Sequence, residues 1–140
     1  MSIKQVDLEL SDESTVLGGN ETILLVEDDV DILNIEKRGL EGRGYTVLSA
    51  ENGRDALSIY KNNRNHIDII VTDVVLPSMN GLDFYQSVQK MNPDVRFLFI
   101  SGYAEGILKQ KFNIEKKIEI LKKPFKSRDL ALMVREILDG

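Results

Sequence analysis

Six side chains that could hold and transfer a phosphoryl group are placed at a few points along the sequence. The acidic run Glu27-Asp28-Asp29 and the single carboxylate Asp73 each follow a short apolar stretch, and Ser101 and Lys123 stand in similar positions later in the chain. A carboxylate can attack phosphorus, while a metal ion, an ammonium and a hydroxyl neutralise the oxygens of the transferring group. This combination fits phosphoryl transfer onto Asp73.

Two of these carboxylates need a cation if they meet. Adjacent strands in register would bring Asp28 close to Asp73, where their mutual repulsion in a partly dry site requires a compensating charge. Mg²⁺ takes oxygen ligands in octahedral geometry and keeps several waters. We therefore expect a Mg²⁺ site, which Mn²⁺ could also fill, made of two carboxylates, a backbone carbonyl and waters.

The elements that position these residues follow from the apolar pattern. From Thr22 onward, short apolar runs alternate with longer amphipathic stretches, which is typical of strands alternating with helices. Most runs are continuously apolar and so suit a parallel sheet covered on both faces, with ligands at the carboxyl ends of its strands. Asn52 and Ser127 can cap the second and last helices. The prediction is a doubly wound α/β domain of the (βα)5 type, with strands at 22–26, 45–49, 67–72, 95–100 and 118–121.

The first 20 residues differ from the rest. They lack apolar periodicity, hold four acidic residues against one lysine, and end in Gly18-Gly19-Asn20. We interpret 1–20 as a linker or disordered tail, with a short packed helix as the alternative, and 21–140 as one domain.

Composition excludes several classes of function. The chain has no cysteine, and therefore no disulfide, thiolate metal site or cysteine nucleophile. Its apolar runs are far shorter than the ~20 residues that cross a bilayer, and its net charge of −5 disfavours nucleic-acid binding. His66, the only histidine, is predicted to be a surface loop residue. We expect a cytoplasmic protein with no membrane or nucleic-acid contact.

In this order and at these positions, the residues resemble the signature of the response-regulator receiver domains of two-component systems. Each piece is common by chance, but several in order, each near a predicted strand end, are highly specific. The resemblance covers about residues 21–138. It is carried by Ile23 to Asp29, Asp73 with Pro77 and Gly81, Ser101, and Lys123-Pro124-Phe125.

The resemblance implies a flavodoxin-like sheet in the order 2-1-3-4-5 and a role for each acidic residue. Asp73 would be the phosphoacceptor and a metal ligand, Asp28 a direct Mg²⁺ ligand and Glu27 a ligand through water. The backbone carbonyl of Val75 would complete the protein ligands. Asp29 is either a further ligand or the N-cap of the first helix, which is the commoner role for an aspartate there.

The resemblance also assigns the phosphoryl contacts and the partner. Ser101 would bond the phosphoryl group and Lys123 would pair with it, whereas Lys122 is only a neighbour. The phosphoryl group would come from a sensor histidine kinase or a histidine phosphotransfer protein. The sequence looks most like the C-terminal receivers of hybrid sensor histidine kinases. The chain would then be no enzyme beyond its own phosphorylation and dephosphorylation, although a longer parent could be a kinase.

Three positions bear on how such a domain would behave. Ile120 stands where the family usually has a switching Tyr or Phe, and a branched aliphatic side chain cannot make the same inward swing. In the family that the sequence resembles, the positions of Val75 and Tyr103 flank the path of attacking water, and we predict that the bulk of these two side chains slows hydrolysis of the acyl phosphate.

Three other functions fit the sequence less well. A phosphatase of the haloacid-dehalogenase type would need a second acid where Val75 stands. A degenerate receiver that acts only as an interaction module stays open because of Ile120. No DNA-binding output is expected within these 140 residues.

Overall fold

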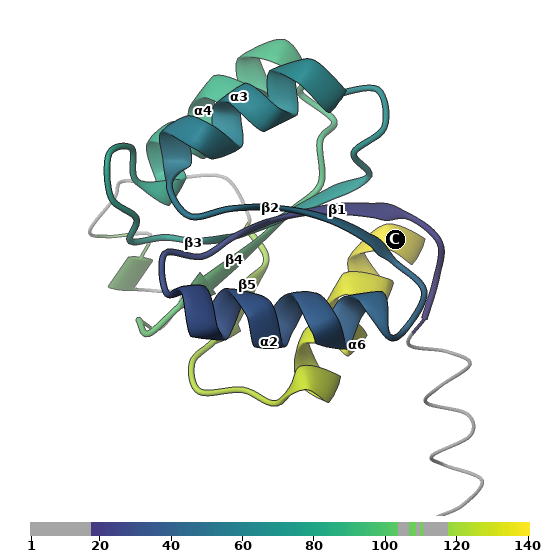
Figure 1. The fold of residues 1–140 in the computed structure, drawn as a ribbon. Helices are drawn as coiled ribbons and strands as arrows, with labels where there is room; N and C mark the ends of the chain where they lie inside the picture. Colours follow the sequence, from purple (N-terminus) through teal and green to yellow (C-terminus); the bar gives the residue numbers. More distant parts are fainter. Residues whose placement is uncertain (1–17, 104–106, 109, 111–117) are drawn as a thin grey trace, which may run out of the picture.

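A parallel five-stranded sheet forms the centre of the computed structural model, which describes residues 18–103, 107, 108, 110 and 118–140. The strands are β1 (Thr22–Val26), β2 (Thr46–Ala50), β3 (Ile69–Asp73), β4 (Phe97–Ser101) and β5 (Ile120–Lys122). The helices with defined bounds are α2 (Val30–Glu41), α3 (Gly53–Asn63), α4 (Gly81–Met91) and α6 (Ser127–Asp139). The strand order is β2-β1-β3-β4-β5, as predicted. Helices α3 and α4 cover one face of the sheet and α2 and α6 the other (Figure 1).

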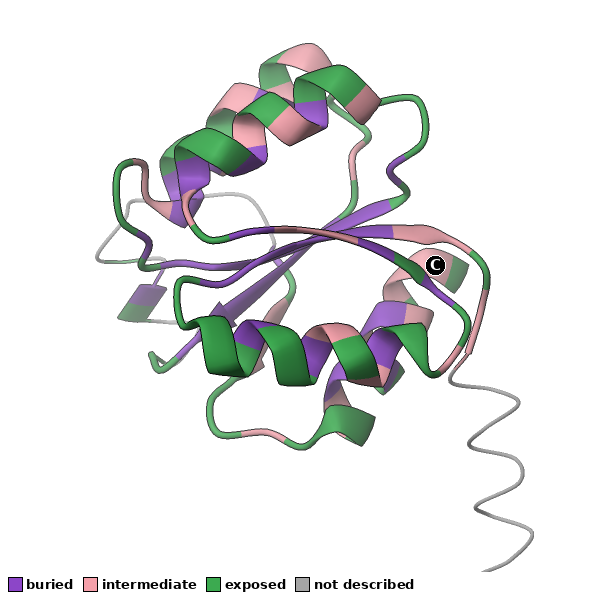
Figure 2. Cartoon of the chain, in the orientation of Figure 1, coloured by how far each residue is buried: buried purple, intermediate pink, exposed green. Residues whose placement is uncertain are grey.

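The continuous apolar runs are explained by two cores, one on each face of the sheet. Leu24 and Val26 of β1 point into the core beneath α3 and α4. Ile23 and Leu25 of the same strand point into the core that α2 and α6 cover. All four are fully buried, and Figure 2 shows the buried colour running along the central strands. A strand buried on both faces has no position that needs a polar side chain.

Strand boundaries differ from the prediction by one or two residues, except in β1. The predicted second to fifth strands started too early, because apolar residues just before each strand pack against the core, buried or partly buried, without joining the sheet. Ile67 is 8% exposed and Ile118 is 6% exposed, and both belong to the core beneath α3 and α4. Burial of a side chain therefore begins before the first ladder hydrogen bond. These strands also end one residue later than predicted, so Asp73 and Ser101 are the last residues of β3 and β4 rather than the first loop residues.

One of the two predicted helix caps is correct. The side chain of Asn52 accepts a hydrogen bond from the backbone N–H of Asp55 at the start of α3. The prediction for Ser127 was wrong, because Ser127 is the first residue of α6 and Lys126 precedes it as the cap residue. The physical reason is Asp129, whose carboxylate accepts the backbone N–H of Lys126 at 2.9 Å and closes the helix start.

Two segments are described only in part: the predicted linker, and the stretch between β4 and β5. Residues 1–17 lie outside the described residues, but Gly18 and Gly19 contact the domain: Gly18 accepts a hydrogen bond from Arg135, and Gly19 donates one to Arg43. Between β4 and β5, residues 107, 108 and 110 are helical, and most of that segment lies outside the described residues. In the part of the chain that the structure describes, no helix has the length and apolar character that a membrane span requires.

Candidate functional site

Three carboxylates from two neighbouring strands converge at one edge of the sheet. β1 pairs with β3 in parallel, and the register places Val26 beside Thr72. The residues that follow, Glu27 and Asp28 directly after β1 and Asp73 at the end of β3, therefore emerge side by side. One carboxylate oxygen from each of the three lies within 4.8 Å of the other two. The sequence-based expectation that Asp28 and Asp73 meet is confirmed.

The loop between β3 and α4 folds back tightly on Asp73. The N–H of Gly81 donates to the carbonyl of Val74 at 2.8 Å, and Ser78 adopts a left-handed conformation with φ of 68°. A Cβ atom at position 81 would collide with the backbone carbonyl oxygen of Asp73. The spacing between Asp73 and Gly81 is thus a steric requirement, since only glycine lets the start of α4 approach the end of β3 so closely.

Lys123 reaches the acidic cluster from the far side of β4. Its backbone N–H donates to the carbonyl of Ser101 at 2.8 Å, which fixes the start of the side chain. Its Nζ atom lies 3.4 Å from Oδ1 of Asp73 and 3.8 Å from Oε1 of Glu27. Burial alone would lower the pKa of Lys123, but the Asp73 and Glu27 carboxylates outweigh this and raise it. The ammonium is therefore charged at neutral pH.

Two oxygens in the cluster are buried and incompletely satisfied. Glu27 is 1% exposed and Asp73 is 3% exposed. Oε1 of Glu27 and Oδ1 of Asp73 accept no hydrogen bond from the described residues. Burial, together with the close carboxylate of Glu27, raises the pKa of Asp73 to about 8, and Lys123 opposes this rise. A single ammonium does not balance three carboxylates, and buried oxygens without donors are the ligand set that a hard divalent cation needs. The residues present fit Mg²⁺.

Asp29 serves a different purpose from its two acidic neighbours. Its Oδ1 atom accepts the backbone N–H groups of Asp31 and Ile32, at 3.0 and 3.2 Å, as the N-cap of α2. Its own N–H donates to Oε2 of Glu27, which orients that carboxylate. The capping alternative is therefore the one observed, and Asp29 is not among the three clustered carboxylates.

A cavity of about 50 Å³ opens directly above the phosphoacceptor candidate. The hydroxyl oxygen of Ser101, which is 4% exposed, faces this region and accepts the backbone N–H of Tyr103 at 2.9 Å. Val75, 66% exposed, and Tyr103, 37% exposed, stand at its mouth. Its lining residues are Asp73, Val74, Val75, Ile100, Ser101, Gly102, Tyr103 and Lys123. The structure thus brings together the predicted nucleophile, hydroxyl and ammonium.

One buried carboxylate near the site was missed. Glu36 of α2 is 7% exposed, and burial, followed by the charge of Glu27, raises its pKa to about 7. A signal was present in the sequence: Leu33, Glu36 and Leu40 have the spacing of one helix face and all three are buried. An acidic residue on the apolar face of an amphipathic helix is unusual and can be recognised without a structure.

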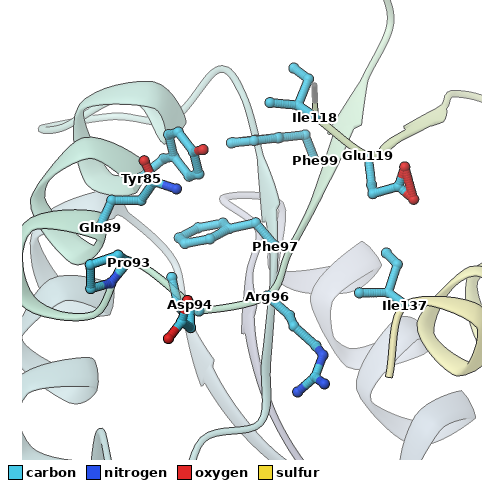
Figure 3. Close-up of a pocket in the computed structure, with 11 residues that line it drawn as sticks. Tyr85, Gln89, Pro93, Asp94, Arg96, Phe97, Phe99, Ile118, Glu119 and Ile137 are labelled. Atoms are coloured by element: carbon cyan, nitrogen blue, oxygen red, sulfur yellow. The ribbon is translucent and has the colours of Figure 1, made fainter. Parts of the chain in front are cut away.

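The aromatic residues near Ile120 belong to the core beneath α3 and α4. Ile120 pairs in register with Phe99, whose ring lies 5.3 Å from that of Tyr85. Tyr85, Phe97 and Phe99 line a separate pocket of about 290 Å³ at the amino ends of β4 and β5 (Figure 3). No described residue lines both this pocket and the cavity above Asp73. The aromatic cluster is therefore part of the core and lies away from the acidic site.

The chain is similar to known proteins along most of its length. The family profile described as the response regulator receiver domain matches residues 23–135. The sensor kinase CckA of Brucella abortus is 39% identical over 128 residues, which are 91% of this chain and 14% of that protein. The response regulator receiver protein CpdR of the same organism is 31% identical over 116 residues, which are 83% of this chain and 95% of that protein. This chain therefore spans a small part of the first relative and nearly all of the second.

Solved structures show the same architecture. The receiver domain of the hybrid histidine kinase CckA superposes with a TM-score of 0.70 at 32% identity, covering 84% of this chain and 98% of that one. A response regulator receiver domain from Clostridium thermocellum gives a TM-score of 0.75 at 27% identity, covering 85% and 94%.

Proposed function

Because the chain belongs to the response regulator receiver family, we propose that Asp73 accepts a phosphoryl group from a phosphohistidine of a partner protein. The observation that carries this proposal is the surroundings of Asp73. Its carboxylate is buried beside Glu27 and Asp28, faces a small cavity, and lies 3.4 Å from the ammonium of Lys123. A nucleophile, a cation and a metal-ligand set thus surround a space suited to a phosphoryl group.

The transfer requires no general acid or base from this chain. An oxygen of the Asp73 carboxylate attacks phosphorus and forms the O–P bond of an acyl phosphate. The P–N bond of the donor breaks, and the imidazole leaves with its electron pair and takes up a proton from water. Lys123 lies where it can pair with the phosphoryl oxygens, and the hydroxyl of Ser101 can donate to one of them.

Asp28 and Asp73 would hold Mg²⁺ directly, Glu27 would hold it through water, and the carbonyl of Val75 would be the fourth protein contribution. When bound, the ion neutralises charge that builds up on the phosphoryl oxygens. The chain contributes the geometry: β1 and β3 fix two of the carboxylates, and the N–H of Asp29 orients that of Glu27. Asp29 itself is engaged as a helix cap, so we do not assign it a ligand role.

Phosphorylation of Asp73 would change the populations of two conformers of the domain. Ser101 ends β4, and its hydroxyl, which accepts a hydrogen bond from the backbone N–H of Tyr103, could at the same time donate one to the phosphoryl group. Ile120 is packed beside Phe99 in the core beneath α3 and α4. Because this side chain cannot act as a swinging ring, we expect the change to spread from Ser101 into the segment after β4.

The partner would be a sensor histidine kinase or a histidine phosphotransfer protein, and we propose that the domain derives from a hybrid kinase. The support is the similarity to the CckA sensor kinase, of which the matching region is 14%. The proposed location is the cytoplasm, where such partners meet their receivers.

Phosphorylation by a small donor tests the central claim. The protein is incubated with acetyl phosphate and Mg²⁺, and the acyl phosphate is measured by intact mass or by Phos-tag electrophoresis. We expect one phosphoryl group on the wild type, and none with EDTA or in Asp73→Asn. Asp83→Asn, which removes an exposed carboxylate on α4, should behave as the wild type. Equal labelling of Asp73→Asn would overturn the proposal.

A further inference from the structure

A third buried carboxylate lies near the site and takes no part in the proposed transfer. Oε1 of Glu36 on α2 is buried and accepts no hydrogen bond from the residues that the structure describes. The unsatisfied oxygens of Glu27 and Asp73 belong to the three-carboxylate cluster, whereas Glu36 lies outside it. A buried carboxylate without a donor is costly, so Glu36 is expected to find a donor in another state of the molecule.

Lys123 is the cation that faces Glu36. A cavity of about 320 Å³ between α2 and α6 is lined by both residues, and the other described residues around it are uncharged: Ile32, Ile35, Pro124, Phe125, Ser127 and Leu130. The positive charge of Lys123 also opposes the rise in the pKa of Glu36 that burial causes. The two groups form no ion pair in this structure, because the ammonium lies beside Asp73 and Glu27 instead.

The ammonium of Lys123 is held only loosely at Asp73. Its Nζ atom lies 3.4 Å from Oδ1 of Asp73 and 3.8 Å from Oε1 of Glu27, whereas a charge-assisted hydrogen bond spans about 2.7–2.9 Å. The Lys123 side chain is 41% exposed, and it lines both the cavity above Asp73 and the cavity beside Glu36. One flexible four-carbon stem therefore borders two separate carboxylate sites.

A divalent cation in the acidic cluster would compete with this ammonium. Both cations would lie against the carboxylate of Asp73, and like charges at such a distance in a partly buried site repel each other strongly. The ammonium must then pair with another anion or extend into water. Glu36 offers an oxygen without a donor in the other cavity that Lys123 lines, so pairing there would satisfy both groups.

We propose that Glu36 is a second acceptor for the ammonium of Lys123. The ammonium lies at Asp73 while the acidic cluster is without a metal ion, and it moves to Glu36 when a divalent cation binds there. A phosphoryl group on Asp73 then draws it back, because that group carries more negative charge than one carboxylate. Glu36 is thus a positioning residue that favours metal binding by holding a charge that would oppose it. This inference rests on the metal site of the proposed function.

Nuclear Overhauser effects between side-chain protons report where the ammonium lies. The experiment uses ¹³C-labelled protein at pH 8, where Glu36 is ionised because its pKa is about 7, with and without saturating Mg²⁺. We expect the contact between the Cε protons of Lys123 and the Cγ protons of Glu36 to be several-fold stronger with Mg²⁺. An unchanged contact would overturn the inference, whether or not the amide signal of Asp28 shows that the metal has bound.

The dissociation constant of Mg²⁺, followed by the amide signal of Asp28, gives an independent test. Glu36→Gln should raise it about fivefold, within the range of couplings between neighbouring groups, because Lys123 then stays at Asp73. In the Lys123→Met background the same substitution should change it less than about twofold, since no ammonium is left to hold. Glu41→Gln, which removes an exposed charge from the same helix, should also change it less than about twofold.

A direct effect of the Glu36 charge on the metal would give a different pattern. Glu36→Gln would then weaken Mg²⁺ binding equally with and without Lys123, and the inference would fail. Equal dissociation constants for the wild type and Glu36→Gln would also overturn it.

Phosphorylation by acetyl phosphate keeps this test apart from the proposed function. If the ammonium moved to Glu36 on Mg²⁺ binding but Asp73 acquired no phosphoryl group, only the transfer function would fail. If Asp73 were phosphorylated and Mg²⁺ bound without moving the ammonium, only the role of Glu36 would fail.

Discussion

The ammonium of Lys123 lies 3.4 Å from Oδ1 of Asp73, although the two residues come from β-strand ends that are not neighbours in the sheet. β4 lies between them, and the carbonyl of Ser101 at its end holds the backbone of Lys123. Lys123 is also 41% exposed in its side chain, whereas the carboxylate of Asp73 is almost completely buried. The cation therefore approaches the nucleophile from the solvent side, where a phosphoryl group would enter.

Removing this ammonium should slow phosphorylation without removing the phosphoacceptor. We expect Lys123→Gln to reduce the rate with acetyl phosphate by about 10- to 100-fold, because one fixed positive charge at the transferring group is lost. The measurement is the initial rate of acyl-phosphate formation. Lys122→Gln is the matched control, since it removes a neighbouring exposed lysine that ends β5. Similar rates in both variants would contradict the role of Lys123.

The close approach of Gly81 to Asp73 predicts a large effect of a small substitution. In Gly81→Ala the new methyl group meets the carbonyl oxygen of Asp73, so α4 must move away from β3. We expect the free energy of unfolding to fall by about 2 kcal/mol, and phosphorylation to slow because Asp73 is displaced. Gly102→Ala is the control, because a Cβ atom there meets nothing within 4 Å. Its stability should stay within about 0.5 kcal/mol of the wild type in urea unfolding.

Some parts of the structure could be predicted from the sequence, and others could not. Strand order followed from the resemblance, and the meeting of Asp28 with Asp73 from parallel register, because both depend on regular geometry. The cap of α6 was misplaced by one residue because Asp129, two residues after Ser127, closes the helix start. The isolation of Glu36 could not be predicted, since it depends on how α6 packs against α2. Patterns of apolar residues report burial, but not which polar atoms remain without a partner.

The residues at the mouth of the cavity should determine how long the acyl phosphate lasts. Val75 and Tyr103 both line the opening above Asp73, and their bulk restricts the approach of water. We expect Val75→Asn and Tyr103→Glu each to lose the phosphoryl group several-fold faster than the wild type, because polar groups there can hold the attacking water. Loss is followed by intact mass after removal of acetyl phosphate.

A surface variant controls for a general effect of added charge on that lifetime. Leu132→Glu introduces the same side chain on α6 at a residue that is 37% exposed, as Tyr103 is. It should dephosphorylate at the wild-type rate. The wild type could instead lose its phosphoryl group as fast as Val75→Asn and Tyr103→Glu, or faster. The residues at the mouth of the cavity would then not protect the acyl phosphate.

The raised pKa of Glu36 predicts how stability depends on pH. Burial shifts the pKa from 4.5 to about 7, so the folded state binds a proton between these values that the unfolded state has released. Stability from this group is therefore complete below about pH 4.5 and is lost as the pH rises toward 7. In Glu36→Gln the side chain does not titrate, so this loss of stability with rising pH does not occur.

Urea unfolding of both proteins at pH 5 and pH 8 measures this difference. Relative to the wild type, Glu36→Gln should gain about 2 kcal/mol between the two values, which follows from the size of the shift. Asp73, whose pKa is also raised, titrates in both proteins, so its contribution cancels in the comparison. Glu41→Gln should follow the wild-type pH dependence, since its side chain is exposed. Parallel pH curves for wild type and Glu36→Gln would mean that the Glu36 carboxylate is not held in an environment that penalises its charge.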